Sequence, residues 1–174
     1  MKNKNVKMLA EAGIMIAIAQ ALSYVTVFQM PQGGSITPGS MIPIILFAIR
    51  WGPKKGILAG AVYGVLQFIL GPKWSFHPVS LIFDYPVAFG LLGLAGLFRN
   101  TSTGIAGGTV LGVLGRFLCH VISGVVVFAS YAPEGQHPLL YSMIYNGSFL
   151  LPELIISLVV VLLVARAIKP VTGI

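Results

Sequence analysis

Long uninterrupted runs of apolar residues make up most of the chain, and short polar or glycine- and proline-rich segments separate them. These runs replace the alternating patterns of a water-facing fold. A helix needs about twenty such residues to cross the hydrocarbon core of a bilayer. We therefore predict an all-α integral membrane bundle of six transmembrane helices. The expected spans are residues 8–28, 41–49, 56–71, 79–98, 104–130 and 141–167.

The second of these runs, residues 41–49, is too short to cross a bilayer alone. It either takes length from the preceding loop or lies in a thinned, protein-lined region. The preceding segment, residues 29–40, contains three glycines and two prolines, which exclude a regular helix. We interpret it either as a hinge-like external loop that closes over a site and excludes water, or as a plain connector.

Composition agrees with a single membrane domain, residues 1–174. Hydrophobic residues make up 56% of the chain and charged residues 9%, with a mean hydropathy of +0.92. A soluble domain usually carries about a quarter charged residues. The apolar run after the first lysines is much longer than the core of a cleavable signal peptide, so none is expected. The single Cys119 excludes an internal disulfide and is expected to be a packing residue.

The net charge of +7 is distributed in a way that argues for membrane topology rather than for nucleic-acid binding. Basic residues stand one to three at a time at the ends of apolar runs, which is the positive-inside pattern. With six crossings, nine of the eleven basic residues share the side of both termini, so we expect cytoplasmic N- and C-termini. These nine are Lys2, Lys4, Lys7, Arg50, Lys54, Lys55, Arg99, Arg166 and Lys169.

Small residues recur at every fourth position in three of the expected spans, and such stripes let helix backbones approach closely in lipid. Internal packing is expected to account for at least two of the stripes. A stripe on a terminal span is alternatively a docking surface for a separate membrane subunit. The three stripes are Gly13, Ala17 and Ala21; Gly56, Gly60 and Gly64; and Gly104, Gly108 and Gly112.

Four polar side chains are expected to converge in the outer half of the bilayer: Asp84, His120, Tyr141 and Asn146. Polar and ionisable groups at membrane depth are costly and need a partner or a function. Each alone would be satisfied by an interhelical hydrogen bond, whereas all four together favour a ligand site. Because aromatic rings such as Tyr85 neighbour the carboxylate, the pattern is typical of a site for a flat cation.

Arg116 and Glu153 lie at similar depths in consecutive spans, and we predict that they form a structural ion pair near mid-membrane. Motifs for chemistry are absent from the sequence. It contains no G-x-x-x-x-G-K-[ST], no H-E-x-x-H or paired-histidine spacing and no G-x-S-x-G. We therefore expect neither an enzyme nor a metal or cofactor site.

Three segments resemble the thiamine-specific S components of energy-coupling factor (ECF) importers. They are PQGGSITPGSMIPI, HPVSLIFDYPVAFGLLGLAGLF and RFLCHVISGVVVF…YAPEG…YSMIYNGS…LPE, and the resemblance covers nearly the whole chain. It implies six helices in a bacterial cell membrane and high-affinity capture of thiamine at the external face. It also implies partners: a transmembrane coupling subunit and two ATPase subunits.

The resemblance also implies roles for residues. Its ligand-binding positions fall on Asp84, Tyr85, His120, Phe128, Tyr141 and Asn146, with Gln32, Trp74 and His77 at the rim. Its docking motif falls on Gly13, Ala17 and Ala21. Two departures bear on affinity: some relatives have Glu in place of Asp84, and some have Trp in place of Phe128.

Three alternatives stay open from the sequence. One is an S component for another vitamin or for a thiamine precursor. Another is a small proton-coupled carrier that uses Asp84, His120, Arg116 and Glu153 as a relay. The third and least favoured is a membrane enzyme.

Overall fold

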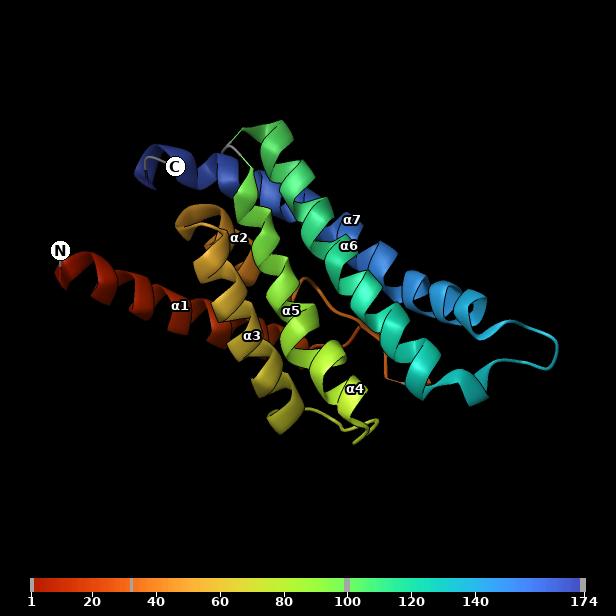
Figure 1. The fold of residues 1–174 in the computed structure, drawn as a ribbon. Helices are drawn as coiled ribbons and strands as arrows, with labels where there is room; N and C mark the ends of the chain where they lie inside the picture. Colours follow the sequence, from red (N-terminus) through yellow and green to blue (C-terminus); the bar gives the residue numbers. More distant parts are fainter. Residues whose placement is uncertain (1, 32, 99–100, 173–174) are drawn as a thin grey trace.

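The computed structural model describes residues 2–31, 33–98 and 101–172, and these form a bundle of helices with one short hairpin (Figure 1). Both termini lie toward the same end of the bundle. The longer elements are α1 (Lys2–Ser23), α2 (Ile42–Trp51), α3 (Pro53–Leu70), α6 (Ser102–Val127) and α7 (Pro138–Thr172). The shorter ones are β1 (Phe28–Gln29), β2 (Ser35–Ile36), α4 (Pro78–Ile82), η1 (Phe83–Val87), α5 (Ala88–Leu91), η2 (Leu92–Leu97) and η3 (Ala129–Tyr131).

Four helical stretches of the described chain are long and apolar enough to cross a membrane: Asn3–Ser23, Pro78–Leu97, Ser102–Val127 and Pro138–Ala167. Large apolar side chains such as Leu9, Leu118 and Leu163 point outward from the bundle, as expected of a surface that faces lipid. The helical membrane fold that the sequence predicts is therefore found. As predicted, α2 is short, and α1 begins and ends earlier in the chain than expected.

The fourth apolar run is helical along its length, but it changes its winding three times. It starts as α4, widens into the π-helical turn η1, returns to α-helix in α5 and tightens into the 3₁₀ segment η2. Pro86 lies inside η1 and has no backbone N–H to donate to the preceding turn. Single π-helical turns of this kind recur at functional sites. Here the wide turn carries Asp84 and Tyr85.

Glycines allow the backbones of α3 and α6 to approach the fourth run closely. A Cβ atom on Gly108 of α6 would lie 2.5 Å from the Ala95 carbonyl oxygen, and one on Gly112 would lie 3.1 Å from Leu92 Cα. On α3, Gly56, Gly60 and Gly64 meet the backbone or side chains of neighbouring helices in the same way. These two stripes serve internal packing, as predicted.

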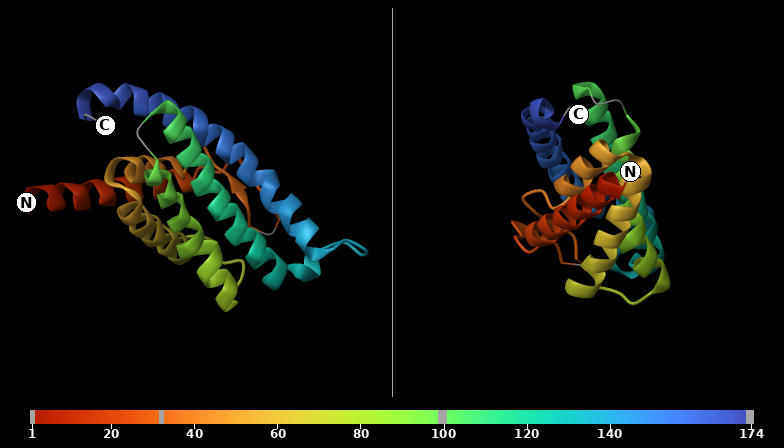
Figure 2. Two further views of the ribbon diagram at one scale, coloured as in Figure 1. Left: turned by 45° about the horizontal axis from the view of Figure 1, so that its top comes forward. Right: turned by 90° about the vertical axis from the view of Figure 1, so that its left-hand side faces the viewer.

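The stripe on α1 differs, since Gly13, Ala17 and Ala21 are all exposed. No atom lies within 4 Å of a Cβ placed on Gly13. The start of α1 projects from the bundle in the views of Figure 2. An ion pair between Glu11 and Arg50, with 3.2 Å between Oε1 and Nε, ties α1 to the end of α2.

The described residues between α1 and α2 form no regular helix, as predicted, but they form a small antiparallel hairpin that was not expected from the sequence. In this hairpin Phe28 pairs with Ile36, and Gln29 pairs with Ser35. The strand after the turn leads into Thr37, whose side chain is buried.

The predicted ion pair between Arg116 and Glu153 is wrong as a direct contact. Glu153 is 2% exposed, and its Oε1 instead accepts hydrogen bonds from the backbone N–H of Thr37 and from Thr37 Oγ1, the latter at 2.7 Å. Thr37 Oγ1 also lies 2.9 Å from Ser40 Oγ. The carboxylate therefore fixes the end of the hairpin segment to α7. Arg116 has other partners in the site described next.

Candidate functional site

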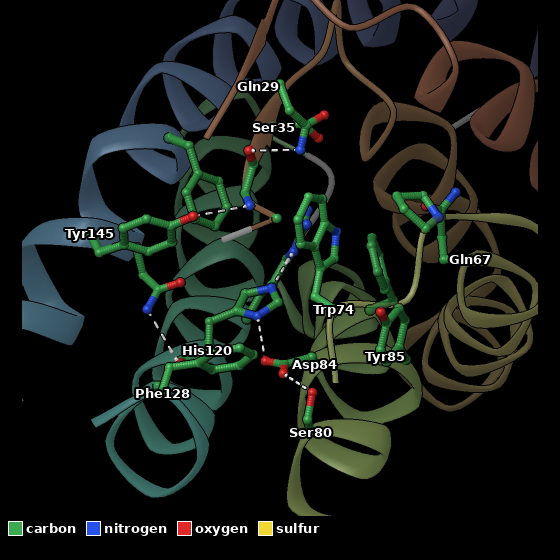
Figure 3. Close-up of a pocket in the computed structure, with 18 of the residues that line it drawn as sticks. Gln29, Ser35, Gln67, Trp74, Ser80, Asp84, Tyr85, His120, Phe128 and Tyr145 are labelled. Carbon is green, nitrogen blue, oxygen red and sulfur yellow. Dashed lines mark hydrogen bonds and ion pairs between the residues drawn. The ribbon is translucent and has the colours of Figure 1, made fainter. Parts of the chain in front are cut away.

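A cavity of about 290 Å³ lies among the ends of the helices that are distant from the termini. The ends of α1, α3 and α6 surround it together with the starts of the fourth apolar run and of α7, and the hairpin segment adds another wall. All six residues predicted to bind a ligand line this cavity: Asp84, Tyr85, His120, Phe128, Tyr141 and Asn146. The first four are labelled in Figure 3. Side chains from three separate parts of the chain thus share one hollow.

The Asp84 carboxylate is held by three hydrogen-bonding groups. Its Oδ2 accepts from Ser80 Oγ at 2.6 Å and from Ser123 Oγ at 2.5 Å. Its Oδ1 lies 2.8 Å from His120 Nδ1. Ser80 comes one helical turn before Asp84, and Ser123 comes nearly one turn after His120. Since an ionised carboxylate offers about four acceptor positions, room remains for a further donor.

The contacts of His120 fix which of its ring nitrogens carries the hydrogen. Arg116 Nε donates to His120 Nε2 at 3.2 Å, so Nε2 acts as the acceptor. The hydrogen of the neutral ring then lies on Nδ1 and is donated to Asp84. The Arg116 guanidinium also lies over the Phe89 ring, 4.3 Å from its centroid, which compensates part of its desolvation. Arg116, His120 and Asp84 form one connected chain along the wall of the cavity.

Aromatic side chains line much of the remaining wall. Tyr141 and Tyr145 lie about one helical turn apart on α7, and their ring centroids are 6.0 Å apart. Tyr85 packs edge-on against Phe68 at 5.1 Å, which fixes the plane of its ring. Trp74 lies beside the hairpin turn, since a Cβ atom on Gly33 would meet its indole ring. The cavity therefore combines one carboxylate with several ring faces, an arrangement suited to a planar cation.

The hairpin segment closes one side of the cavity. Gln29, Gly33, Gly34 and Ser35 all line it. The Gly34 backbone N–H donates to Tyr145 Oη at 3.4 Å, and this contact joins the hairpin turn to α7. Together with the Glu153 contact to Thr37, it holds the segment against the helix that supplies two of the predicted site residues.

The three rim predictions have different outcomes. Trp74 lines the cavity. His77 does not; its Nδ1 accepts from the backbone N–H of Val79 and caps the start of α4. Gln32 lies outside the described residues.

Sequence reasoning missed several polar residues of the wall, among them Ser80 and Gln67. The signal for Ser80 was its spacing of four residues before Asp84. The signal for Gln67 was that it is a lone amide in an otherwise apolar run. In the described part of the chain, no group of three or more His, Cys, Asp or Glu side chains is arranged to hold a metal ion.

The chain is similar to known proteins over most of its length. The family model described as "Thiamine transporter protein" matches residues 9–172. The chain is 36% identical over 177 residues to the thiamine transporter ThiT of Bacillus subtilis, covering 93% of this chain and 92% of that protein. It is 32% identical to ThiT of Lacticaseibacillus paracasei, covering 92% and 87%.

Two solved structures share the fold. ThiT from Listeria monocytogenes superimposes with a TM-score of 0.84 at 25% identity, covering 94% of this chain and 96% of that one. The S component of a bacterial ECF transporter superimposes with a TM-score of 0.56 at 18% identity, with 95% of each chain covered. The second likeness is one of fold alone.

Proposed function

This chain belongs to the thiamine transporter protein family, and on that premise we propose that it is the membrane-embedded, high-affinity thiamine-binding subunit of an ATP-driven ECF importer. It binds the vitamin and performs no chemistry on it. The B. subtilis and L. paracasei relatives are described as thiamine transporters, and this chain matches 92% and 87% of their length. The S-component fold fits the same role.

The observation that carries the proposal is the composition of the cavity wall. Asp84 offers a fixed negative charge, and Tyr85, Phe128 and Tyr141 offer ring faces around one hollow. Thiamine is a flat cation, with a permanently charged thiazolium ring joined to an aminopyrimidine. The carboxylate balances the charge or accepts from the exocyclic amine, and the rings stack on the ligand. Asn146 and Tyr141 add hydrogen-bonding groups from α7.

We place the cavity at the external face of the membrane and both termini in the cytoplasm. Arg50, Lys54 and Lys55 cluster at the turn between α2 and α3, at the end of the bundle where the termini lie. The positive-inside rule assigns that end to the cytoplasm. In this arrangement the single domain crosses the bilayer six times, with α2 and α3 as the two shorter crossings. The hairpin segment then covers the cavity from outside.

The exposed stripe on α1 is our candidate for docking the transmembrane coupling subunit, whose two ATPase partners would drive transport. Gly13, Ala17 and Ala21 do not pack inside this chain, so a partner helix can approach them closely. Ala17→Trp is expected to leave thiamine affinity unchanged and to abolish thiamine uptake, because the indole would hold the partner helix away. Retained uptake by this variant would remove the docking role.

Uptake measurements also separate the proposal from a proton-coupled carrier. The connected chain of Arg116, His120 and Asp84 is the observation that favours this second candidate. Thiamine uptake by membrane vesicles should require ATP and the coupling module, and it should survive collapse of the proton gradient. Uptake that persists without the module and collapses with the gradient would favour the carrier. Calorimetry with thiamine and with its pyrimidine half alone tests whether a precursor is the true ligand.

A further inference from the structure

Three side-chain amides line the cavity. Gln29 of the hairpin is exposed, whereas Gln67 on α3 and Asn146 on α7 are not. An amide nitrogen donates two hydrogen bonds, and an amide oxygen accepts them. The orientation of each amide therefore determines what it offers to a ligand. The neighbours of Gln67 and of Asn146 fix that orientation.

The Gln67 nitrogen faces three acceptors where α3 meets α1. Nε2 lies 2.9 Å from Gln20 Oε1, 2.8 Å from Ser23 Oγ and 3.1 Å from Tyr63 Oη. Both hydroxyls already donate their own hydrogens to backbone carbonyls, Ser23 to Gln20 at 2.7 Å and Tyr63 to Ala19 at 3.2 Å. They can only accept from Gln67, so the nitrogen is held toward α1.

The Asn146 amide is fixed in the same way on the other side of the cavity. Nδ2 lies 2.9 Å from the Ser142 carbonyl oxygen, 3.3 Å from the His120 carbonyl oxygen and 3.2 Å from Ser142 Oγ. That hydroxyl donates its own hydrogen to the Val121 carbonyl oxygen at 3.1 Å. The Asn146 nitrogen is therefore held toward α6.

Both amide oxygens are left without a donor. Within the residues that the structure describes, no hydrogen bond reaches Gln67 Oε1 or Asn146 Oδ1. Neither oxygen is among the buried side-chain atoms that lack a partner, so each is accessible to a donor that enters the cavity. The two amides belong to different sides of the cavity: Asn146 joins the His120 and Asp84 side, whereas Gln67 lies beyond Tyr85 (Figure 3).

Thiamine carries donors at two places. Its aminopyrimidine has an exocyclic amine with two N–H groups, and its thiazolium carries a hydroxyethyl arm with one O–H. The two N–H groups of the amine match the side of the cavity that offers two acceptors, Asn146 Oδ1 and the Asp84 carboxylate. The single hydroxyl matches Gln67, the other amide oxygen of the wall whose residue is not exposed. On the basis of the proposed function, we propose that Gln67 forms the subsite for the terminal hydroxyl of the ligand. This hydroxyl donates a hydrogen bond to Gln67 Oε1.

The test compares two ligands on purified full-length protein: thiamine, and the analogue in which an ethyl group replaces the hydroxyethyl arm. The wild-type chain is expected to bind thiamine at least about five-fold more tightly, the effect of one ordinary hydrogen bond. Gln67→Met should bind both compounds equally. The control Gln20→Met removes one acceptor of the Gln67 nitrogen outside the cavity lining, but Ser23 and Tyr63 still hold that nitrogen, so this variant should keep the preference. A general loss of packing would lower both affinities together and leave their ratio unchanged.

Equal affinities in the wild type, or a preference that persists in Gln67→Met, would overturn the subsite. If Gln67→Met does not fold, a structure of the wild-type complex decides the question. The ligand hydroxyl should then lie within about 3.2 Å of Gln67 Oε1, and a hydroxyl directed at Asp84 would refute the proposal. A wild-type chain that binds neither compound would instead overturn the proposed function.

Discussion

Asp84→Asn is expected to weaken thiamine binding by about ten-fold or more, since hydrogen bonds to charged groups contribute about 1.5–3 kcal/mol. The amide can keep its oxygen toward His120 and turn its nitrogen toward Ser80 and Ser123, whose hydroxyls can accept. The fold should therefore survive, and the loss should come from the missing negative charge. Calorimetric titration of the purified variant measures it.

The matched control for this prediction is Glu134→Gln. Glu134 is exposed in the loop between α6 and α7 and does not line the cavity. This change removes the same charge from the chain, and its effect on thiamine affinity should be negligible. Equal weakening by both variants would mean that only the net charge matters. Unchanged affinity in Asp84→Asn would exclude the carboxylate from the site.

Gly108→Ala is expected to lower the thermal unfolding temperature by about 2–12 °C. The added Cβ would lie 2.5 Å from the Ala95 carbonyl oxygen, a backbone atom that cannot turn aside. Overpacking of this kind typically costs about 1–3 kcal/mol, and each kcal/mol lowers the unfolding temperature of a chain of this size by about 2–4 °C. Thermal unfolding of the purified protein in detergent measures the effect.

Gly107 provides the control on the same helix. It is exposed, and the nearest atom to its added Cβ would be 4.0 Å away, in Phe98. Gly107→Ala should leave stability unchanged or raise it slightly, because alanine favours the helix. If the two variants unfolded at the same temperature, close packing between α6 and η2 would not be the reason for the glycine.

The composition of the cavity could be predicted largely from the sequence, because polar side chains inside apolar runs are few and helical rise fixes their depth. Asp84 and His120 illustrate this, since each is rare in its run and both were expected in the outer half of the bilayer. Depth alone does not give the rotation of a helix about its axis.

The prediction for Arg116 failed for that reason. Its depth matches that of Glu153, but its side chain reaches His120 one turn along the same helix and the face of Phe89. Glu153 turns instead to Thr37, which is distant in sequence and lies outside any helix. A short hairpin and a π-helical turn likewise leave little periodic signal, because both depend on tertiary packing.

The fluorescence of Trp74 gives the most direct test that the ligand occupies this cavity. Trp74 lines the cavity, whereas Trp51 is the last residue of α2, at the opposite end of the bundle. In a Trp51→Phe variant, thiamine should quench the remaining Trp74 emission with one-site saturation, and Asp84→Asn in that background should shift the titration to higher concentrations. Binding detected by calorimetry without any change in Trp74 emission would place thiamine elsewhere and contradict the account.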